Sequence, residues 1–181
     1  MRTLLKILKG ILLIVVILVG LALVTALFVK KDYSLTKEIV INKPKTEVFD
    51  YIKYLKNQNN YSKWALMDPN MQKTFTGTDA TPGFVSAWDG NKEVGKGSQE
   101  IKRITEGQKI ETEIHFIKPF ESTMQSYMTT DSIAAAQTKV SWNISGRSKW
   151  PMNLMNLFMD KMVGGDLTTG LENLKKIQEK Q

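Results

Sequence analysis

The sequence predicts an α+β fold: a seven-stranded antiparallel sheet covered by two short helices and a long C-terminal helix, preceded by one transmembrane helix. Three observations predict this architecture: an uncharged apolar run near the N-terminus, a series of short alternating segments separated by turn residues, and a helical pattern at the C-terminal end. Roughly 150 residues follow the apolar run, which is enough for one domain with a sizeable core but few for two.

The apolar run, residues 10–29, contains no charged residue and is rich in Leu, Ile and Val. About 20 such residues are needed to cross the roughly 30 Å hydrocarbon core of a bilayer as a helix, so we expect a membrane span. A basic flank, residues 1–9, precedes this span, and a linker, residues 30–35, follows it. A cleaved signal peptide is the alternative, although its apolar core is usually only about 7 to 15 residues long.

The basic residues beside the span predict its orientation. Arg2, Lys6, Lys9 and the N-terminal amine precede the span, whereas Lys30 and Lys31 follow it. Because the flank with more basic residues usually stays in the cytoplasm, we expect a cytoplasmic N-terminus and an extracytoplasmic domain. The protein is thus predicted to be a single-pass membrane protein.

Charge and composition exclude several functions. The first 31 residues hold five of the 25 basic residues and none of the 18 acidic ones, so the rest of the chain carries a net charge of only +2. Such a domain lacks the basic surface that nucleic-acid binding requires. The chain has no cysteine and a single histidine, which excludes thiol nucleophiles and multi-histidine metal sites. We expect neither a metal nor another cofactor.

The domain, predicted to cover residues 36–180, begins with one strand and two short helices. Leu35, Ile39 and Ile41 recur with period two, as in a strand with one buried face. Pro44 then begins a helix, and residues 61–64 form a second helical turn. Short segments separated by Gly, Pro, Asn and Asp follow, as in an antiparallel meander. The predicted strands cover residues 34–42, 72–78, 84–88, 97–105, 109–117, 121–130 and 138–145.

The C-terminal helical region consists of two parts with different apolar faces. Pro151 begins a Met-rich run, and four of the nine Met residues lie in residues 152–162. Leu167, Leu171 and Leu174 form a second stripe at i, i+4 and i+7, which does not continue the first. We therefore predict a kink at residues 164–166, with the Met-rich part covering one end of the sheet.

Several motifs in this order resemble a known family. Residues 43–49 (KPKTEVF), 88–91 (WDGN), 94–97 (VGKG) and 170–175 (GLENLK) are similar to the bacterial polyketide cyclase/dehydrase and lipid-transport branch of the Bet v 1-like, or START-like, superfamily, also called SRPBCC. The resemblance covers roughly residues 36–177. It implies a helix-grip fold with a deep apolar cavity that holds a lipid, polyketide, sterol or similar molecule. Members of the superfamily range from binding proteins to cyclases.

Large apolar residues on the predicted inner faces are candidates for the cavity wall. Each residue alone is more typical of ordinary core packing, and only the set indicates a ligand site. Arg103 shares a predicted strand face with Ile101, so it either contacts a ligand carboxylate or lies exposed. The candidate ligand-binding residues are Trp64, Phe84, Trp88, Arg103, Ile114, Phe116, Met124, Trp142, Phe158, Met159 and Met162.

His115 has the side chain best suited to proton transfer near neutral pH, but its position argues against catalysis. Strand alternation places Ile114 and Phe116 on the inner face and Glu111, Glu113 and His115 together on the outer face. Two acids and one histidine on an exposed strand are more typical of a solvated surface than of a metal site. The sequence therefore predicts no catalytic and no metal-binding residue.

These observations favour a membrane-anchored protein that binds a hydrophobic small molecule, because no titratable pair is predicted inside the cavity. A cyclase-like or dehydrase-like enzyme, which holds a flexible substrate in a reactive shape, is one alternative. A protein-interaction or sensor module is another. The sequence does not indicate an oligomeric state.

Overall fold

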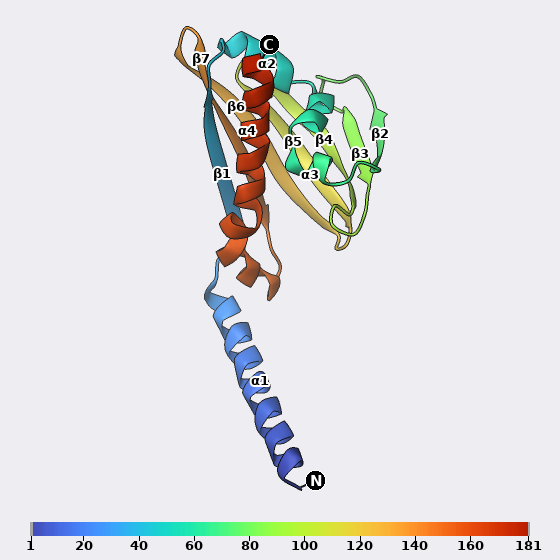
Figure 1. Cartoon of the computed structure of the whole chain (residues 1–181), viewed down its shortest axis with the longest axis vertical. Helices are drawn as coiled ribbons and strands as arrows, with labels where there is room; N and C mark the ends of the chain where they lie inside the picture. The colour runs from blue at the N-terminus through green and yellow to red at the C-terminus, as the bar shows by residue number, and fades with distance from the viewer. Residues whose placement is uncertain (1, 181) are drawn as a thin grey trace. The chain divides into compact units, whose positions relative to one another are not determined.

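The computed structural model describes residues 2–180, apart from the side chains of residues 2, 3 and 5 (Figure 1). It consists of two units. One unit combines the N-terminal segment up to Tyr33 with Arg147–Met159, and the other combines Ser34–Gly146 with the segment from Asp160 onward. The predicted domain limits, residues 36–180, remain a prediction, but most of that range lies in the second unit.

In the first unit, helix α1 (Arg2–Phe28) contains the predicted span. Its Lys6–Phe28 part is long and apolar enough to cross a membrane, and a signal sequence would have the same properties. The basic residues before the apolar run are helical too, so α1 begins earlier than the predicted span.

The second unit is built on one seven-stranded antiparallel sheet, as predicted. The strands lie in the order β1-β7-β6-β5-β4-β3-β2. From β2 to β7, each strand therefore pairs with the next strand in the chain, and β1 pairs with β7. Short turns connect most of these strands, which is typical of a meander. The strands are β1 (Asp32–Ile41), β2 (Gln72–Thr76), β3 (Val85–Asp89), β4 (Lys96–Thr105), β5 (Lys109–Lys118), β6 (Ser122–Ala134) and β7 (Gln137–Arg147).

Three short helices, rather than the predicted two, separate β1 from β2. They are α2 (Lys45–Ile52), the 3-10 helix η1 (Leu55–Asn60) and α3 (Lys63–Met67). Pro44 precedes α2, as predicted. The carboxylate of Asp79 accepts hydrogen bonds from the backbone N–H groups of Leu55 and Lys56, at 2.8 and 3.0 Å. These bonds satisfy free N–H groups at the start of η1, which the sequence pattern did not reveal.

The C-terminal region is not one helix. The 3-10 helix η2 (Met152–Phe158) and the π-helical turn η3 (Asp160–Gly164) precede the regular helix α4 (Gly165–Lys180). The helix type therefore changes between Gly164 and Gly165, within the predicted kink, and the kink itself stays a prediction. The expectation that the Met-rich part covers one end of the sheet stays a prediction. Most of that part belongs to the first unit, where Asn153 bonds to the end of α1.

The core of the second unit lies between α4 and the β7 side of the sheet. The leucines of α4, Leu167, Leu171 and Leu174, are fully buried against Trp142 and its neighbours on β7. A Cβ on Gly170 would lie 2.8 Å from the Trp142 ring, so only glycine allows this close approach of helix and indole. The regular spacing of these leucines thus packs one face of α4 against β7 in the buried core.

Candidate functional site

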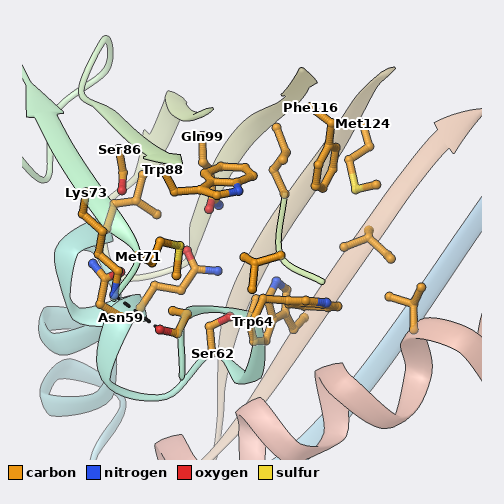
Figure 2. A pocket seen from close by; sticks show the side chains of 18 residues that line it. Asn59, Ser62, Trp64, Met71, Lys73, Ser86, Trp88, Gln99, Phe116 and Met124 are labelled. Carbon is orange, nitrogen blue, oxygen red and sulfur yellow. Dashed lines mark hydrogen bonds between the residues drawn. The ribbon is translucent and has the colours of Figure 1, made fainter. Parts of the chain in front are cut away.

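A cavity of about 220 Å³ lies in the second unit and is lined by residues of every strand from β2 to β7. Its size is slightly below the roughly 300 to 1,000 Å³ of typical small-molecule sites. The wall is mostly apolar. Strand residues form one side, and residues of η1 and α3, together with Val163 beside α4, form the other (Figure 2).

The first part of the strand wall is a row of directly paired residues. Lys73 on β2 lies opposite Trp88 on β3, which lies opposite Gly97 on β4, which in turn lies opposite Phe116 on β5. The rings of Trp88 and Phe116 meet edge to face, with centroids 5.6 Å apart and planes at 79°. Such aromatic pairs are stabilising in addition to the area that they bury.

Gly97 makes this aromatic contact possible. A Cβ at this position would lie 2.6 Å from the Trp88 ring and 2.5 Å from the carbonyl oxygen of His115. Any side chain would therefore push Trp88 away from the strand. The missing side chain at Gly97 sets the position of the Trp88 ring and, with it, the shape of the cavity wall.

A second row runs parallel to the first. Ser86 on β3 lies opposite Gln99 on β4, and the row continues through Ile114 on β5 to Met124 on β6. The Gln99 amide donates a hydrogen bond to the Thr112 hydroxyl at 2.9 Å. Along this second row the wall changes from the polar Ser86 and Gln99 on β3 and β4 to the apolar Ile114 and Met124 on β5 and β6.

The opposite side of the cavity repeats this gradient. Gln58 and Asn59 of η1 line the polar end, whereas Trp64 of α3 and Val163 line the wall elsewhere. Figure 2 shows Asn59, Lys73 and Ser86 at one end of the cavity, and Phe116 and Met124 at the other. Trp64 meets Trp142 edge to face, with ring centroids 6.4 Å apart. Trp142 therefore separates the cavity from the filled core.

Lys73 is the one titratable side chain among the described residues that line the cavity. General acid–base catalysis usually employs a carboxylate or a histidine near its substrate, often in pairs. This wall instead provides an ammonium group, several neutral hydrogen-bonding groups and a large apolar surface. Such an arrangement is suited to holding an amphipathic molecule.

The sequence of this domain matches a known protein family. Residues 33–179 match the family described as polyketide cyclase/dehydrase and lipid transport. The chain belongs to this family. Its resemblance to the Bet v 1-like superfamily is thereby confirmed, as is the helix-grip fold. No curated protein sequence matches the chain.

Solved structures share the fold at very low sequence identity. Norcoclaurine synthase from Thalictrum flavum, in complex with dopamine and hydroxybenzaldehyde, has a TM-score of 0.64 at 6% identity, over 83% of this chain and 88% of its own. The di-domain ARO/CYC protein StfQ of the steffimycin pathway has a TM-score of 0.61 at 9% identity, over 82% of this chain and 51% of its own. Ara h 8.0201 has a TM-score of 0.58 at 11% identity, over 83% and 99%. At this identity the matches show the fold alone.

Six of the candidate ligand-binding residues predicted from the sequence line the cavity of this protein: Trp64, Trp88, Ile114, Phe116, Met124 and Trp142. Phe84 does not. It is fully buried in a separate small cluster with Leu55 and Ile101, and the Ile101 backbone N–H donates to the Phe84 carbonyl oxygen at 2.9 Å. Its ring stacks on Phe75, with centroids 6.1 Å apart.

Arg103 also lies away from the cavity. The pairing of β4 with β5 shifts between Ile101 and Arg103, and such an irregularity moves the following side chains to the other face of the sheet. Arg103 is exposed and pairs with Glu111. The sequence alternation predicted a shared face with Ile101 because a bulge leaves no clear mark on the residue pattern.

Phe158, Met159 and Met162 do not line the cavity either. Phe158 and Met159 lie in the first unit, and Met162, although in the second, is half exposed in the π-helical turn. A uniform helix would have presented these residues on one side, but this segment forms a 3-10 helix and a π-turn instead. The prediction failed because it assumed a regular helix.

His115 and its neighbours lie on the outer face, as predicted from alternation. The His115 ring contacts Thr123, and the Glu113 carboxylate accepts a hydrogen bond from Gln125 at 2.7 Å. Hydrogen bonds from Arg103 and then from Lys109 lower the pKa of Glu111 from 4.5 to about 2. In the part of the chain that the structure describes, no three His, Cys, Asp or Glu side chains gather in a metal-binding arrangement.

Sequence reasoning missed the polar part of the wall. Lys73 and Gln99 have the parity of inward-facing residues on their strands, so alternation could have indicated both. The residues of η1, including Gln58 and Asn59, carried no such signal because a 3-10 helix has no strong sequence pattern.

Proposed function

We propose that this protein binds a hydrophobic small molecule in the cavity while anchored to a membrane by α1. The observation that carries this proposal is the contrast inside one domain: the part around Trp142 and the leucines of α4 is a buried core, whereas the part beside Trp88 and Phe116 leaves about 220 Å³ open. Apolar walls with a few polar groups are typical of small-molecule sites. The family description, which includes lipid transport, supports the same function.

The anchor is proposed from helix α1. Its apolar length is sufficient for a span, and the basic residues before it support a cytoplasmic N-terminus with an extracytoplasmic domain. A tether of this kind raises the concentration of membrane-derived molecules near the binding domain. The intact mass of the purified protein distinguishes a retained anchor from a cleaved signal sequence. Protease protection in spheroplasts tests the orientation of the protein. Digestion of the domain without lysis supports an extracytoplasmic domain, and protection of the domain contradicts it.

Native mass spectrometry of the detergent-extracted protein, followed by organic extraction, tests the binding function. We expect a co-purifying apolar molecule with the wild-type chain. The variant Ala65→Phe, which adds a ring at the cavity wall, should lose it. The matched variant Ala134→Phe adds the same ring at an exposed position and should retain the molecule. Equal occupancy in both variants, or none in the wild type, would contradict the proposal.

A cyclase-like or dehydrase-like enzyme is the second candidate, and the family description favours it. In that case Lys73 would be the residue able to exchange a proton with the substrate. The variant Lys73→Met would then abolish turnover of an extracted ligand, whereas a binding protein would release that ligand unchanged.

A further inference from the structure

The polar end of the cavity has a net positive character. Lys73 lies opposite Trp88 in the first row, and Ser86 and Gln99 lie in the second. The Lys73 ammonium donates a hydrogen bond to the carbonyl oxygen of Ala65 at 3.3 Å (Figure 2). Among the described residues, no carboxylate lies within the 4.0 Å of a salt bridge to it. A half-buried ammonium thus faces the cavity without a neutralising partner.

Trp88 presents a second unmatched donor. Its Nε1 atom is inaccessible to solvent and has no hydrogen-bond acceptor among the described residues. Because this atom is closed to solvent, Lys73 rather than Trp88 is the donor that a ligand at this end of the cavity can reach. The indole cannot turn freely to find another partner, because its ring lies against Gly97 and meets Phe116 edge to face.

The apolar end has the opposite chemistry. Phe116 and Met124 close the two rows on β5 and β6, and Ile144 on β7 continues the apolar wall. Methionine adapts its shape to different apolar groups. A molecule that satisfies both ends has an anionic acceptor group at one end and a hydrocarbon chain at the other.

We infer, on the basis of the proposed binding function, that the ligand is a single-chain amphipathic carboxylate. Its carboxylate pairs with the Lys73 ammonium, and its chain extends along the two rows toward Phe116 and Met124. Charge-assisted hydrogen bonds of this kind are about twice as strong as neutral ones. The cavity accommodates a short chain within its walls, and longer chains extend through the opening.

Titration calorimetry with octanoate and octan-1-ol, using protein in lipid nanodiscs and empty nanodiscs as a blank, tests this inference. We expect the wild type to bind octanoate more tightly than octan-1-ol. Lys73→Met should weaken octanoate binding about tenfold or more and leave octan-1-ol binding unchanged, as expected for loss of a charge-assisted bond. Lys73→Arg should restore part of the affinity. Lys92→Met, at an exposed turn, is the matched control and should behave like the wild type.

Equal affinities for the two ligands in both proteins would overturn the carboxylate assignment but support a hydrophobic cavity. Binding of neither ligand, together with no co-purifying molecule in the extraction experiment, would count against the proposed function itself. The two failures are therefore distinguishable.

An independent observation concerns the first unit, where Arg147–Met159, termed here the clamp segment, encloses the C-terminal end of α1. The Asn153 side chain is fully buried, and its amide donates hydrogen bonds to the carbonyl oxygens of Ala26 and Val29, at 2.7 and 2.8 Å. The Asn156 amide donates to the carbonyl oxygens of Lys30 and Lys31, at 3.0 and 2.9 Å. These bonds satisfy carbonyl groups that a helix end leaves free.

The outer surface of the clamp segment is apolar. Trp150, Met152, Leu157 and Phe158 are all 46% exposed or more, and Phe28 at the end of α1 is 84% exposed. This surface is continuous with the apolar side chains of α1. Lys30, Lys31 and Lys149 are exposed beside it, as is common where a span leaves the bilayer.

We propose, on the basis of the proposed membrane anchor, that the clamp segment lies in the interface of the bilayer that α1 crosses. The apolar side chains enter the lipid, and the two asparagines satisfy the carbonyl groups of the helix end at a depth where water is scarce. Trp150 is then an interfacial anchor of the span. The segment would hold the start of β1 and the end of β7 at the membrane surface.

Because the chain has no cysteine, single spin labels can test this placement. In a nanodisc, a nitroxide at Leu157→Cys should be more accessible to oxygen than to a water-soluble nickel chelate, as should a label at Val16→Cys in α1. A label at Ser132→Cys, in the exposed hairpin between β6 and β7, should show the reverse preference. A Leu157 label that behaves like the Ser132 label overturns the interfacial placement. A Val16 label in water would overturn the anchor as well.

Discussion

Two regions of the same inner face of the sheet in the second unit differ in the helices that cover them. Around Trp142 on β7, α4 presents leucines at a regular spacing, and these pack against the indole in the buried core. Beside the cavity, η1 and α3 provide polar side chains such as Gln58 and Ser62, and open space remains between them and the strands. The comparison teaches that the helical cover, rather than the sheet, decides where this domain is solid and where it is hollow.

The largest expected difference concerns side-chain truncation in the two regions. Leu171→Ala in the buried core should lower the free energy of unfolding by about 2 to 5 kcal/mol, because a fully buried side chain leaves a new cavity. Ile114→Ala should cost clearly less, since this side chain already borders open space. Urea titration of both variants in the same detergent measures the difference. Equal costs would show that the cavity is filled in solution.

The second prediction concerns Gly97. Gly97→Ala should destabilise the protein by about 1 to 3 kcal/mol and weaken ligand binding, because the new Cβ collides with the Trp88 ring and the His115 carbonyl group. Gly165→Ala is the control, since a Cβ there meets no atom within 4 Å. Thermal unfolding and ligand titration test both variants. A stable Gly97→Ala protein with unchanged binding would show that the Trp88 position does not shape the site.

A smaller effect is expected at Gln99. Gln99→Leu removes the hydrogen bond to Thr112 and should cost about 0.5 to 1.5 kcal/mol. Thr112 keeps a second contact, since its hydroxyl donates to the carbonyl oxygen of Ser126 at 3.3 Å. The same urea titration measures this change. A cost as large as that of Leu171→Ala would mean that the polar end of the cavity is as important for stability as the filled core.

The smallest expected effect lies on the outer face and depends on pH. The folded pKa of Glu111, about 2, is below its ordinary value of 4.5, so this group stabilises the fold above pH 4.5 and loses that contribution as the pH falls toward 2. Glu111→Gln should therefore lose stability relative to the wild type at pH 6 but hardly at pH 2. The difference should be small because Arg103 is largely exposed. Glu93→Gln, at an exposed turn, should match the wild type in melting temperature at both values.

Much of this architecture could be predicted from residue periodicity. Ile114 and Phe116 were expected to face inward and His115 outward, and the structure places them so, because consecutive strand residues point to opposite faces of a sheet. Arg103 was misplaced because the irregularity after Ile101 changes this alternation without a sequence signal. Phe158 was misplaced because its segment adopts a 3-10 helix beside α1 rather than a regular helix over the sheet.

The sequence by itself determined the elements: the apolar helix, the order of seven strands and the terminal helix, since each depends on neighbours within a few residues. Only the tertiary structure decided which part of the domain is hollow. That outcome depends on pairings such as Lys73 with Trp88 and Gly97 with Phe116, which join residues far apart in the chain. It also depends on how far the side chains of η1 and α3 reach, and no local pattern encodes that distance.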